Sequence, residues 1–227
     1  VIVPPSWEGN RIDYALEAAE RHPDRFAVMG RIALNDPKSK NLIPTWLDQP
    51  GMLGIRVMVS REVVKWLEDG TTDWFWPAAE AAGIPLMIHA PGLAPAVAKI
   101  AEAHPRLRLI VDHMNLSSDI KKAKGIPEAV ATTADLARYP NISVKVSSVP
   151  SYSYEAYPFR DMKEHLKRVI GAFGPRRSFW GSDFTHAHGK ATYRQYVTHF
   201  TEELDFLSKE DKKLIMGDAI LAALNWH

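Results

Sequence analysis

Polar side chains interrupt or end five apolar segments of this 227-residue chain, and their types could together bind an acid and activate water. Histidine ends the segment Leu86–His89, and an Asp-His pair ends Leu109–His113. Arg56 and Lys145 lie inside two further segments, and aspartate ends Phe179–Asp183. Imidazoles and carboxylates move protons and bind divalent metals, whereas lysine and arginine bind carboxylates. These segments predict one site for a small carboxylated molecule if the fold brings them together.

Each of these residues also has an ordinary structural explanation. A single histidine at a strand end is commonly just hydrogen-bonded, and an aspartate that opens a loop commonly caps a turn. The recurrence of polar residues at equivalent places favours the functional interpretation. Asp112 is the exception, because neighbouring side chains alternate faces along a strand. We therefore expect Asp112 to point away from the site and to have a structural or supporting role.

The elements that must position these residues alternate between apolar strands and helices. Strand-like runs are expected at Val1–Val3, Phe26–Leu34, Leu53–Val59, Pro85–His89, Leu107–Asp112, Ile142–Ser147 and Ser178–Gly181. Helical patterns are expected at Arg11–His22, Thr72–Ala82, Leu93–His104, Ile126–Tyr139, Phe159–Phe173, Thr192–Leu207 and Lys209–Leu224. Most strand runs are continuously apolar, as in parallel sheets covered on both faces. No break in composition divides the chain, so we expect one domain over residues 1–227.

Two α/β architectures fit this alternation. An open doubly wound sheet predicts a glycine-rich phosphate loop, and neither G-x-G-x-x-G nor G-x-x-x-x-G-K-S/T occurs in the sequence. A (β/α)8 TIM barrel predicts polar side chains at the carboxyl ends of several strands, which is the observed pattern. The sequence therefore predicts a (β/α)8 barrel whose mouth collects the polar residues.

The composition excludes several classes of protein. Lys and Arg number 28 against 27 Asp and Glu, a formal charge of +1, so nothing predicts a nucleic-acid or anionic-membrane partner. Hydrophobic residues make up 46% and charged residues 24%, as in globular proteins. The longest uncharged apolar runs, such as Ile84 to Ala98, are too short and interrupted to span a membrane. Cysteine is absent, which excludes disulfides and thiolate sites, and we expect a cytoplasmic location.

Loops after the strands supply further candidates. His186 follows Asp183 in a glycine-containing loop and is expected to contact substrate. Tyr157 belongs to a tyrosine-rich loop after the lysine-bearing strand, and loops of this kind build barrel sites. Tryptophans recur between Trp66 and Trp76, and if exposed they predict a homodimer.

A series of short motifs runs through the chain in order. They are Arg21–Phe26 (RHPDRF), Asp48–Arg56 (DQPGMLGIR), Pro85–His89 (PLMIH), His104–His113 (HPRLRLIVDH), Tyr139–Ser147 (YPNISVKVS), Phe179–Asp183 (FWGSD) and Met216–Ala219 (MGDA). This series resembles the amidohydrolase superfamily, specifically the amidohydrolase-2 branch that includes lactonases and nonoxidative decarboxylases. The resemblance implies a (β/α)8 barrel hydrolase with a small-molecule substrate.

The resemblance also implies roles for individual residues. His89 corresponds to the family's strand-five histidine, His113 to its strand-six histidine and Asp183 to its strand-eight aspartate. Arg56 resembles the arginine that binds a substrate carboxylate in the lactonases, and Lys145 is a second candidate for that task. In metal-dependent members the strand-five histidine and strand-eight aspartate are ligands, so zinc or manganese would bind His89 and Asp183. In lactonase-like members the metal is often dispensable.

One family feature is absent from this sequence. The family begins with a His-x-His pair at the end of its first strand, and no such pair occurs before Arg56. The opening Val1–Ser6 resembles the family's second strand. We therefore expect a barrel that lacks its first strand–helix unit here, either because a segment before Val1 is missing or because a strand from elsewhere replaces it.

The expected function is hydrolysis of a lactone or related cyclic ester of a small carboxylated compound. Asp183 would activate water, and His113, with His89 or a metal, would stabilise the oxyanion. A metal-dependent nonoxidative decarboxylase of an aromatic or enol acid would use the same residues. Outside enzymes, the alternative is a catalytically inactive barrel that binds a small ligand.

Overall fold

A six-stranded parallel sheet forms the centre of the protein. The computed structural model describes residues 1–59, 61–122, 124–186 and 188–226. The strands are β1 (Val28–Gly30), β2 (Met52–Met58), β3 (Leu86–His89), β4 (Leu109–Val111), β5 (Ile142–Lys145) and β6 (Ser178–Phe179). Each pairs in parallel with the next along the chain, in the order β1 to β6. This order is that of a (β/α) barrel opened between its first and last strand, as the sequence predicts.

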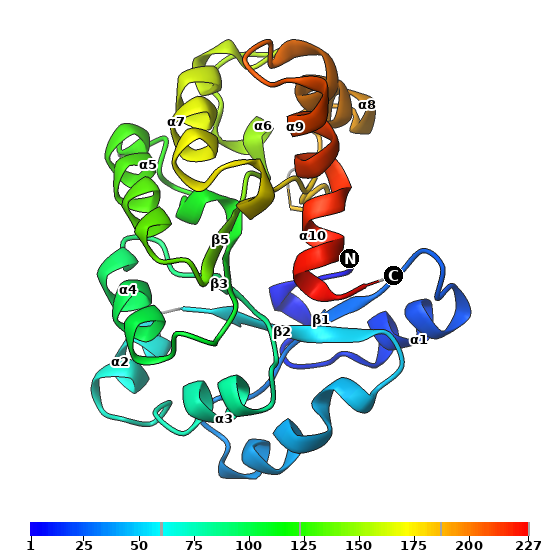
Figure 1. Ribbon diagram of the computed structural model, residues 1–227, viewed down its shortest axis with the longest axis vertical. Coiled ribbons are helices and arrows are strands. Elements are labelled where there is room, and N and C mark those ends of the chain that lie inside the picture. Colours follow the sequence, from blue (N-terminus) through cyan, green and yellow to red (C-terminus); the bar gives the residue numbers. More distant parts are fainter. Residues whose placement is uncertain (60, 123, 187, 227) are drawn as a thin grey trace.

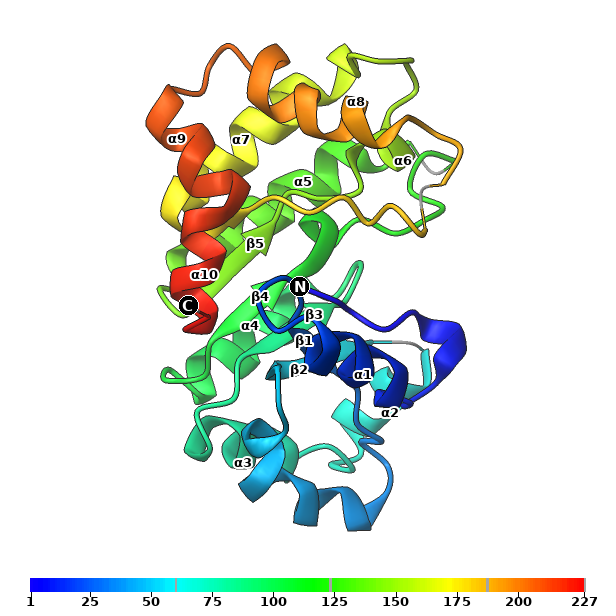
Figure 2. The ribbon, with the colours of Figure 1, turned by 90° about the vertical axis from the view of Figure 1, so that its right-hand side faces the viewer.

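Helices lie on both sides of the sheet (Figure 1). They are α1 (Asp13–Arg21), α2 (Arg61–Glu68), α3 (Phe75–Ala81), α4 (Ala94–Ala103), α5 (Ile126–Asp135), α6 (Val149–Tyr152), α7 (Lys163–Phe173), α8 (Tyr193–Thr198), α9 (Lys209–Lys213) and α10 (Ala219–Leu224). Helices α4, α5 and α7 follow one another along one side of the sheet, and α10 lies on the other side (Figure 1). Figure 2 shows α7, α8 and α9 at one end of the molecule and α3 at the other. None of the helices in the described ranges has the length and apolar character that a membrane crossing requires.

The two faces of the sheet belong to two different apolar clusters. In β3, Leu86 and Ile88 pack into the large cluster under the outer helices, whereas Met87 points to the opposite face. There Met87 packs with Met29, Ile110, Phe179 and two residues of α10, Ala219 and Leu224. Full burial of such side chains contributes about 1.5–3 kcal/mol each. The inner face is therefore closed by side chains, and polar residues on it occupy the carboxyl ends of the strands.

Several predicted elements are shorter in the structure. The predicted strand Val1–Val3 is reduced to one parallel bridge between Ile2 and Val28. The last strand ends early because the Trp180 N–H donates to the Ile215 carbonyl instead of continuing the sheet. The predicted helix Thr192–Leu207 divides into α8 and a wider π-helical turn. These differences lie at the ends of elements, and hydrogen bonds to residues distant in the sequence determine where an element ends.

The C-terminal helical run and one connection also differ from expectation. The predicted helix Lys209–Leu224 is divided into α9, a π-helical turn over Leu214–Asp218 and α10. The connection from β1 to β2 contains a 3-10 helix, Pro37–Asp48, that the sequence pattern did not indicate. Its first turn is capped by Asp36, whose carboxylate accepts from the Lys38 N–H.

The tryptophans that motivated the homodimer prediction pack within the chain. Trp76 is buried, and Trp66 and Trp74 are half-buried against the core. The Trp74 indole N–H donates to the Leu34 carbonyl. The premise that these rings form an exposed surface is therefore wrong, and the homodimer stays a prediction.

Candidate active site

The fold places the predicted polar residues at the carboxyl ends of neighbouring strands. His89 ends β3, Lys145 ends β5, and Arg56 lies within β2. His113 lies in the 3-10 turn directly after β4, and Asp183 follows β6. Because the strands are parallel, their carboxyl ends meet at the same edge of the sheet.

Three of these residues form a contact cluster. The Nε2 atom of His113 lies 3.8 Å from Oδ2 of Asp183. The rings of His89 and His113 meet edge to face, with centroids 5.4 Å apart. The Asp183 side chain is 24% exposed against 12% for His113, so the carboxylate is the more accessible of the two. A carboxylate that water can reach, with an imidazole beside it, is suited to moving protons.

Hydrogen bonds fix the orientation of each member of this cluster. The Ser148 hydroxyl donates to Oδ2 of Asp183 at 2.8 Å, and Nδ1 of His113 lies 2.8 Å from the Ser147 hydroxyl. His89 Nε2 donates to the Leu116 carbonyl at 2.9 Å, because a carbonyl can only accept. The roles of the two serines were not predicted. Their sequence signal is the Ser-Ser pair that directly follows the lysine-bearing strand.

The backbone at the cluster is held in an unfavourable conformation. His113, Ser148 and Asp183 have φ values of 54°, 61° and 51°, in the left-handed region. This region costs a non-glycine residue roughly 1–2 kcal/mol. The Asn115 side chain helps hold the turn after β4, because it accepts from the N–H of Ala90 and donates to its carbonyl. Strained residues that the surroundings hold in place are typical of functional sites.

Both histidines are neutral at neutral pH. Burial lowers the pKa of His89, and it lowers the pKa of His113 well below its ordinary value of 6.5. A neutral imidazole has one N–H donor and one acceptor nitrogen. His113 can therefore accept a hydrogen bond at one nitrogen and donate from the other.

A second cluster forms around Asp112. The Asp112 side chain points to the inner face of the sheet, and not away from the site as was predicted. Arg56 Nε donates to Asp112 Oδ2 at 2.6 Å, and Lys145 Nζ lies 3.0 Å from Oδ1. All three side chains are largely buried, with exposed fractions of 6%, 1% and 14% for Arg56, Asp112 and Lys145. Burial by itself would raise the pKa of Asp112, but the charges of Lys145 and Arg56 lower it instead.

The expectation that Asp112 points away from the site was wrong because the strand is shorter than predicted. Strand β4 ends at Val111, and Asp112 begins a 3-10 turn in which His113 and Met114 are left-handed. Side-chain alternation applies only along an extended strand. Asp112 therefore faces the inner side and pairs with the two cations that were predicted to bind substrate.

A third cation, Arg31, was missed by the sequence reasoning. Its Nε donates to the Pro4 carbonyl at 2.9 Å, and the residue is half-buried beside Arg56. A cavity of about 140 Å³ has both arginines in its lining. The signal was available in the sequence, because Arg31 interrupts an apolar strand-like run just as Arg56 does.

The two predicted rim residues lie apart from these contacts. His186 is exposed, and its N–H donates to the Asp183 carbonyl at 3.1 Å. The Tyr157 hydroxyl is hydrogen-bonded to Thr198 and Glu203, at 2.9 and 3.0 Å. A tyrosine that was not predicted, Tyr152, is connected to the cluster, because its hydroxyl donates to the Leu116 carbonyl that also accepts from His89.

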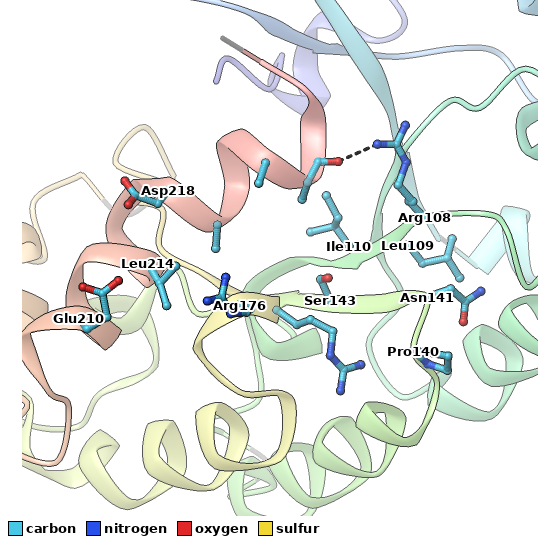
Figure 3. Close-up of a pocket in the computed structure, with 14 residues that line it drawn as sticks. Arg108, Leu109, Ile110, Pro140, Asn141, Ser143, Arg176, Glu210, Leu214 and Asp218 are labelled. Atoms are coloured by element: carbon cyan, nitrogen blue, oxygen red, sulfur yellow. Dashed lines mark hydrogen bonds between the residues drawn. The ribbon is translucent and has the colours of Figure 1, made fainter.

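A larger cavity lies at the opposite end of the sheet. It measures about 670 Å³ and is lined by residues near the amino ends of β4 and β5, including Ile110 and Ser143, and by α10 (Figure 3). Arg108 crosses it and donates to the Ala223 carbonyl at 2.9 Å, drawn dashed in Figure 3. Barrel enzymes act at the carboxyl ends of their strands. This cavity contains none of the predicted site residues.

The described residues do not by themselves form a metal site. Nowhere in these ranges do three His, Asp or Glu side chains gather as an ion would require. The predicted ligand His89 donates its Nε2 proton to the Leu116 carbonyl, which leaves Nδ1 as its free ligating atom.

Parallel strands alternating with helices, with polar groups at the strand ends, define an α/β protein of the (β/α)-barrel type. The chain belongs to the amidohydrolase family, because the model of that family matches residues 1–226. Both the fold class and the family that the motifs resembled are thereby confirmed.

Three relatives illustrate the similarity. L-fucono-1,5-lactonase from Burkholderia ambifaria is 28% identical over 193 residues, which are 79% of this chain and 61% of that protein. The chain thus spans less than two thirds of that relative's length. A zinc-bound amidohydrolase from Burkholderia multivorans superposes with a TM-score of 0.80 at 19% identity, covering 94% of this chain and 78% of that one. For 5-carboxyvanillate decarboxylase from Sphingomonas paucimobilis the TM-score is 0.67 at 16% identity, with 98% and 75% covered.

Proposed function

We propose that this protein hydrolyses a lactone, or a related cyclic ester, of a small carboxylated compound. The observation that carries the proposal is the contact of His113 with the accessible carboxylate of Asp183, next to a buried group of cations. The similarity to L-fucono-1,5-lactonase supports a lactone as the substrate class.

In this reaction Asp183 acts as the general base. Its carboxylate takes a proton from water, the water oxygen bonds to the lactone carbonyl carbon, and the carbonyl oxygen becomes an oxyanion. Collapse of this intermediate breaks the ring C–O bond, and the proton held by Asp183 passes to the leaving alkoxide. Ser148 keeps one carboxylate oxygen in position by its hydrogen bond to Oδ2.

His113 stabilises the oxyanion. With the Ser147 hydroxyl donating to Nδ1, the proton of the neutral imidazole is on Nε2, the nitrogen that faces Asp183. A donor placed where charge develops commonly lowers the barrier by about 3 kcal/mol. His89 packs against His113 and keeps that ring in its orientation.

The substrate carboxylate binds the cations of the inner face. Arg56 and Lys145 bring two positive charges against the single negative charge of Asp112, so one positive charge remains uncompensated in this group. Because both side chains are held by Asp112, they meet a ligand from fixed positions. We also propose His186 and Tyr157 as substrate contacts at the rim of the site.

A divalent metal, zinc or manganese, would take His89 and Asp183 as ligands from this chain. The described residues supply no third ligand, so the steps proposed above use protein groups alone. Metal analysis of the purified protein, before and after chelation, measures whether an ion is bound and whether activity requires it.

The test of the function is a hydrolysis assay with a matched pair of substrates. A carboxylated γ-lactone and its methyl ester are offered to the protein, and acid release is followed in a pH-stat. We expect turnover of the carboxylate and a much higher KM for the ester, which lacks the charge that the cations bind. No hydrolysis of any lactone offered would contradict the proposal and favour a ligand-binding barrel.

A decarboxylase is the second candidate, because the structural similarity extends to 5-carboxyvanillate decarboxylase. Decarboxylation releases CO2 and requires no water to attack carbon. Measuring CO2 release from aromatic and enol acids in the same preparation therefore separates the two reactions. Chelation should abolish this activity if a metal-dependent decarboxylase is present.

A further inference from the structure

Two arginines line one small cavity at the carboxyl ends of β1 and β2. The cavity of about 140 Å³ is bounded by Arg31 and Arg56, and further walls come from Asn10, Asn35 and Trp66. A water molecule takes up about 30 Å³ in the liquid. The cavity therefore has room for about four such waters, which admits a carboxylate group together with several of the atoms that carry it.

Arg31 has unused donors at this cavity. A guanidinium has N–H groups on Nε and on both Nη atoms, and the Nε–H of Arg31 donates to the Pro4 carbonyl. Among the residues whose side chains the structure describes, none forms a hydrogen bond or a salt bridge with the two Nη groups, although Asp112 lies close enough for its charge to act on Arg31. The residue is half-buried and lines the cavity, so a ligand there can reach it.

The charges around the cavity do not balance. Arg31, Arg56 and Lys145 carry three positive charges, and the one carboxylate among them, that of Asp112, is already paired with Arg56 and Lys145. Burial, and then the charge of Arg56, lowers the pKa of Arg31. An arginine nevertheless stays protonated at neutral pH. Two like charges therefore face the same small space, and an anion between them would relieve their repulsion.

We propose that Arg31 and Arg56 together hold the carboxylate of the substrate in this cavity. The inference rests on the proposed function, because it supplies the place where the carboxylate of the lactone binds. Guanidinium groups bind carboxylates through paired N–H···O bonds, which are among the stronger hydrogen bonds in proteins. Arg31 is then a substrate-binding residue beside Arg56, and Lys145 and Arg56 share the carboxylate of Asp112.

The experiment uses two probes that contain no ester bond. Tetrahydrofuran-2-carboxylate has the ring and charge of a carboxylated lactone, and tetrahydrofuran-2-carboxamide has the same shape without the charge. Affinities of both are measured by calorimetry or by NMR titration. We expect the wild-type protein to bind the carboxylate at least tenfold more tightly than the carboxamide.

Three variants locate the binding group. Arg31→Gln should lower the affinity for the carboxylate probe about tenfold and change the affinity for the carboxamide probe by less than twofold. Arg176→Gln is the matched control, because this exposed arginine lines the cavity at the opposite end and its loss changes net charge equally. Ala33→Leu keeps both arginines but fills part of the cavity that Ala33 lines. It should therefore also lower the affinity for the carboxylate probe. If Arg31→Gln does not fold, Ala33→Leu still tests whether the carboxylate binds in this cavity.

Three results would overturn the inference: no preference for the carboxylate in the wild type, equal losses in Arg31→Gln and Arg176→Gln, or full affinity in Ala33→Leu. Because neither probe can be hydrolysed, the outcome is separate from the test of the reaction. Arg31-dependent binding without lactone hydrolysis would overturn the proposed function alone. Hydrolysis with binding that does not depend on Arg31 would overturn only the assignment of this cavity.

Discussion

The guanidinium of Arg56 and the carboxylate of Asp112 meet at 2.6 Å across the inner face of the sheet, although 56 positions separate them in the chain. Arg56 lies on β2 and Asp112 follows β4, so the pair reaches across the intervening strand β3. Removing one partner of a buried pair leaves an uncompensated charge, which is costly. This pair links the stability of the barrel to the charge of its binding site.

Replacing Asp112 should therefore destabilise the protein strongly. Asp112→Asn keeps the shape of the side chain but leaves Arg56 and Lys145 buried without a negative partner. Loss of a buried partner costs about 3–5 kcal/mol, which urea unfolding measures. Asp24→Asn, at an exposed aspartate, is the control and should change stability by less than about 0.5 kcal/mol. Equal effects of the two substitutions would contradict a structural role of the pair.

Replacing Asp183 should remove activity and leave the fold intact. Asp183→Asn retains the size of the side chain and can still accept the hydrogen bond from Ser148. It cannot take a proton from water, and general-base catalysis typically contributes about 10²–10⁴-fold. We expect kcat to fall by that factor while the melting temperature changes little. Near-normal turnover in this variant would show that another group is the base.

Removing the hydroxyl that holds Asp183 should affect the rate more than binding. Ser148→Ala loses the 2.8 Å hydrogen bond to Oδ2, and hydrogen bonds to charged groups are worth roughly 1.5–3 kcal/mol. We expect kcat to fall about tenfold or more with KM nearly unchanged. Ser118→Ala, at an exposed serine, should leave both constants as they are. A change confined to KM would argue against a positioning role.

The buried His199 should make the protein less stable in acid. Burial lowers its pKa to about 4, below the ordinary 6.5, so on acidification the unfolded chain binds the proton first. The contribution of the neutral ring is complete above pH 6.5 and is lost as the pH falls towards 4. At one pKa unit per 1.36 kcal/mol, the loss between pH 7 and pH 5 is about 2 kcal/mol.

The check compares the wild type with His199→Leu, which cannot be protonated. Urea unfolding at pH 7 and pH 5 gives the change in free energy of unfolding for each protein. The change should be about 2 kcal/mol smaller in the variant, because the other buried histidines contribute equally to both. Parallel pH dependences would show that His199 is not buried in the neutral form.

Local patterns in the sequence were enough to predict which segments form the sheet. The apolar runs that contain β2 to β6 were recognised because a strand buried on both faces must be apolar throughout, and that requirement can be read residue by residue. The strand ends were placed less well. Trp180 leaves the sheet because of a hydrogen bond to Ile215, and no local pattern reports a partner 35 positions away.

The sequence by itself determined the α/β class, the family resemblance and the residues at the strand ends, because these depend on residue type and on spacing along the chain. Only the tertiary structure decided which charges meet. Asp112 pairs with both Arg56 and Lys145, and Arg31 lines a small cavity together with Arg56. These relationships depend on where β4 ends and how its turn bends, which packing of the whole sheet determines. Charge pairing in a buried interior depends on distances in space, and a linear sequence does not contain them.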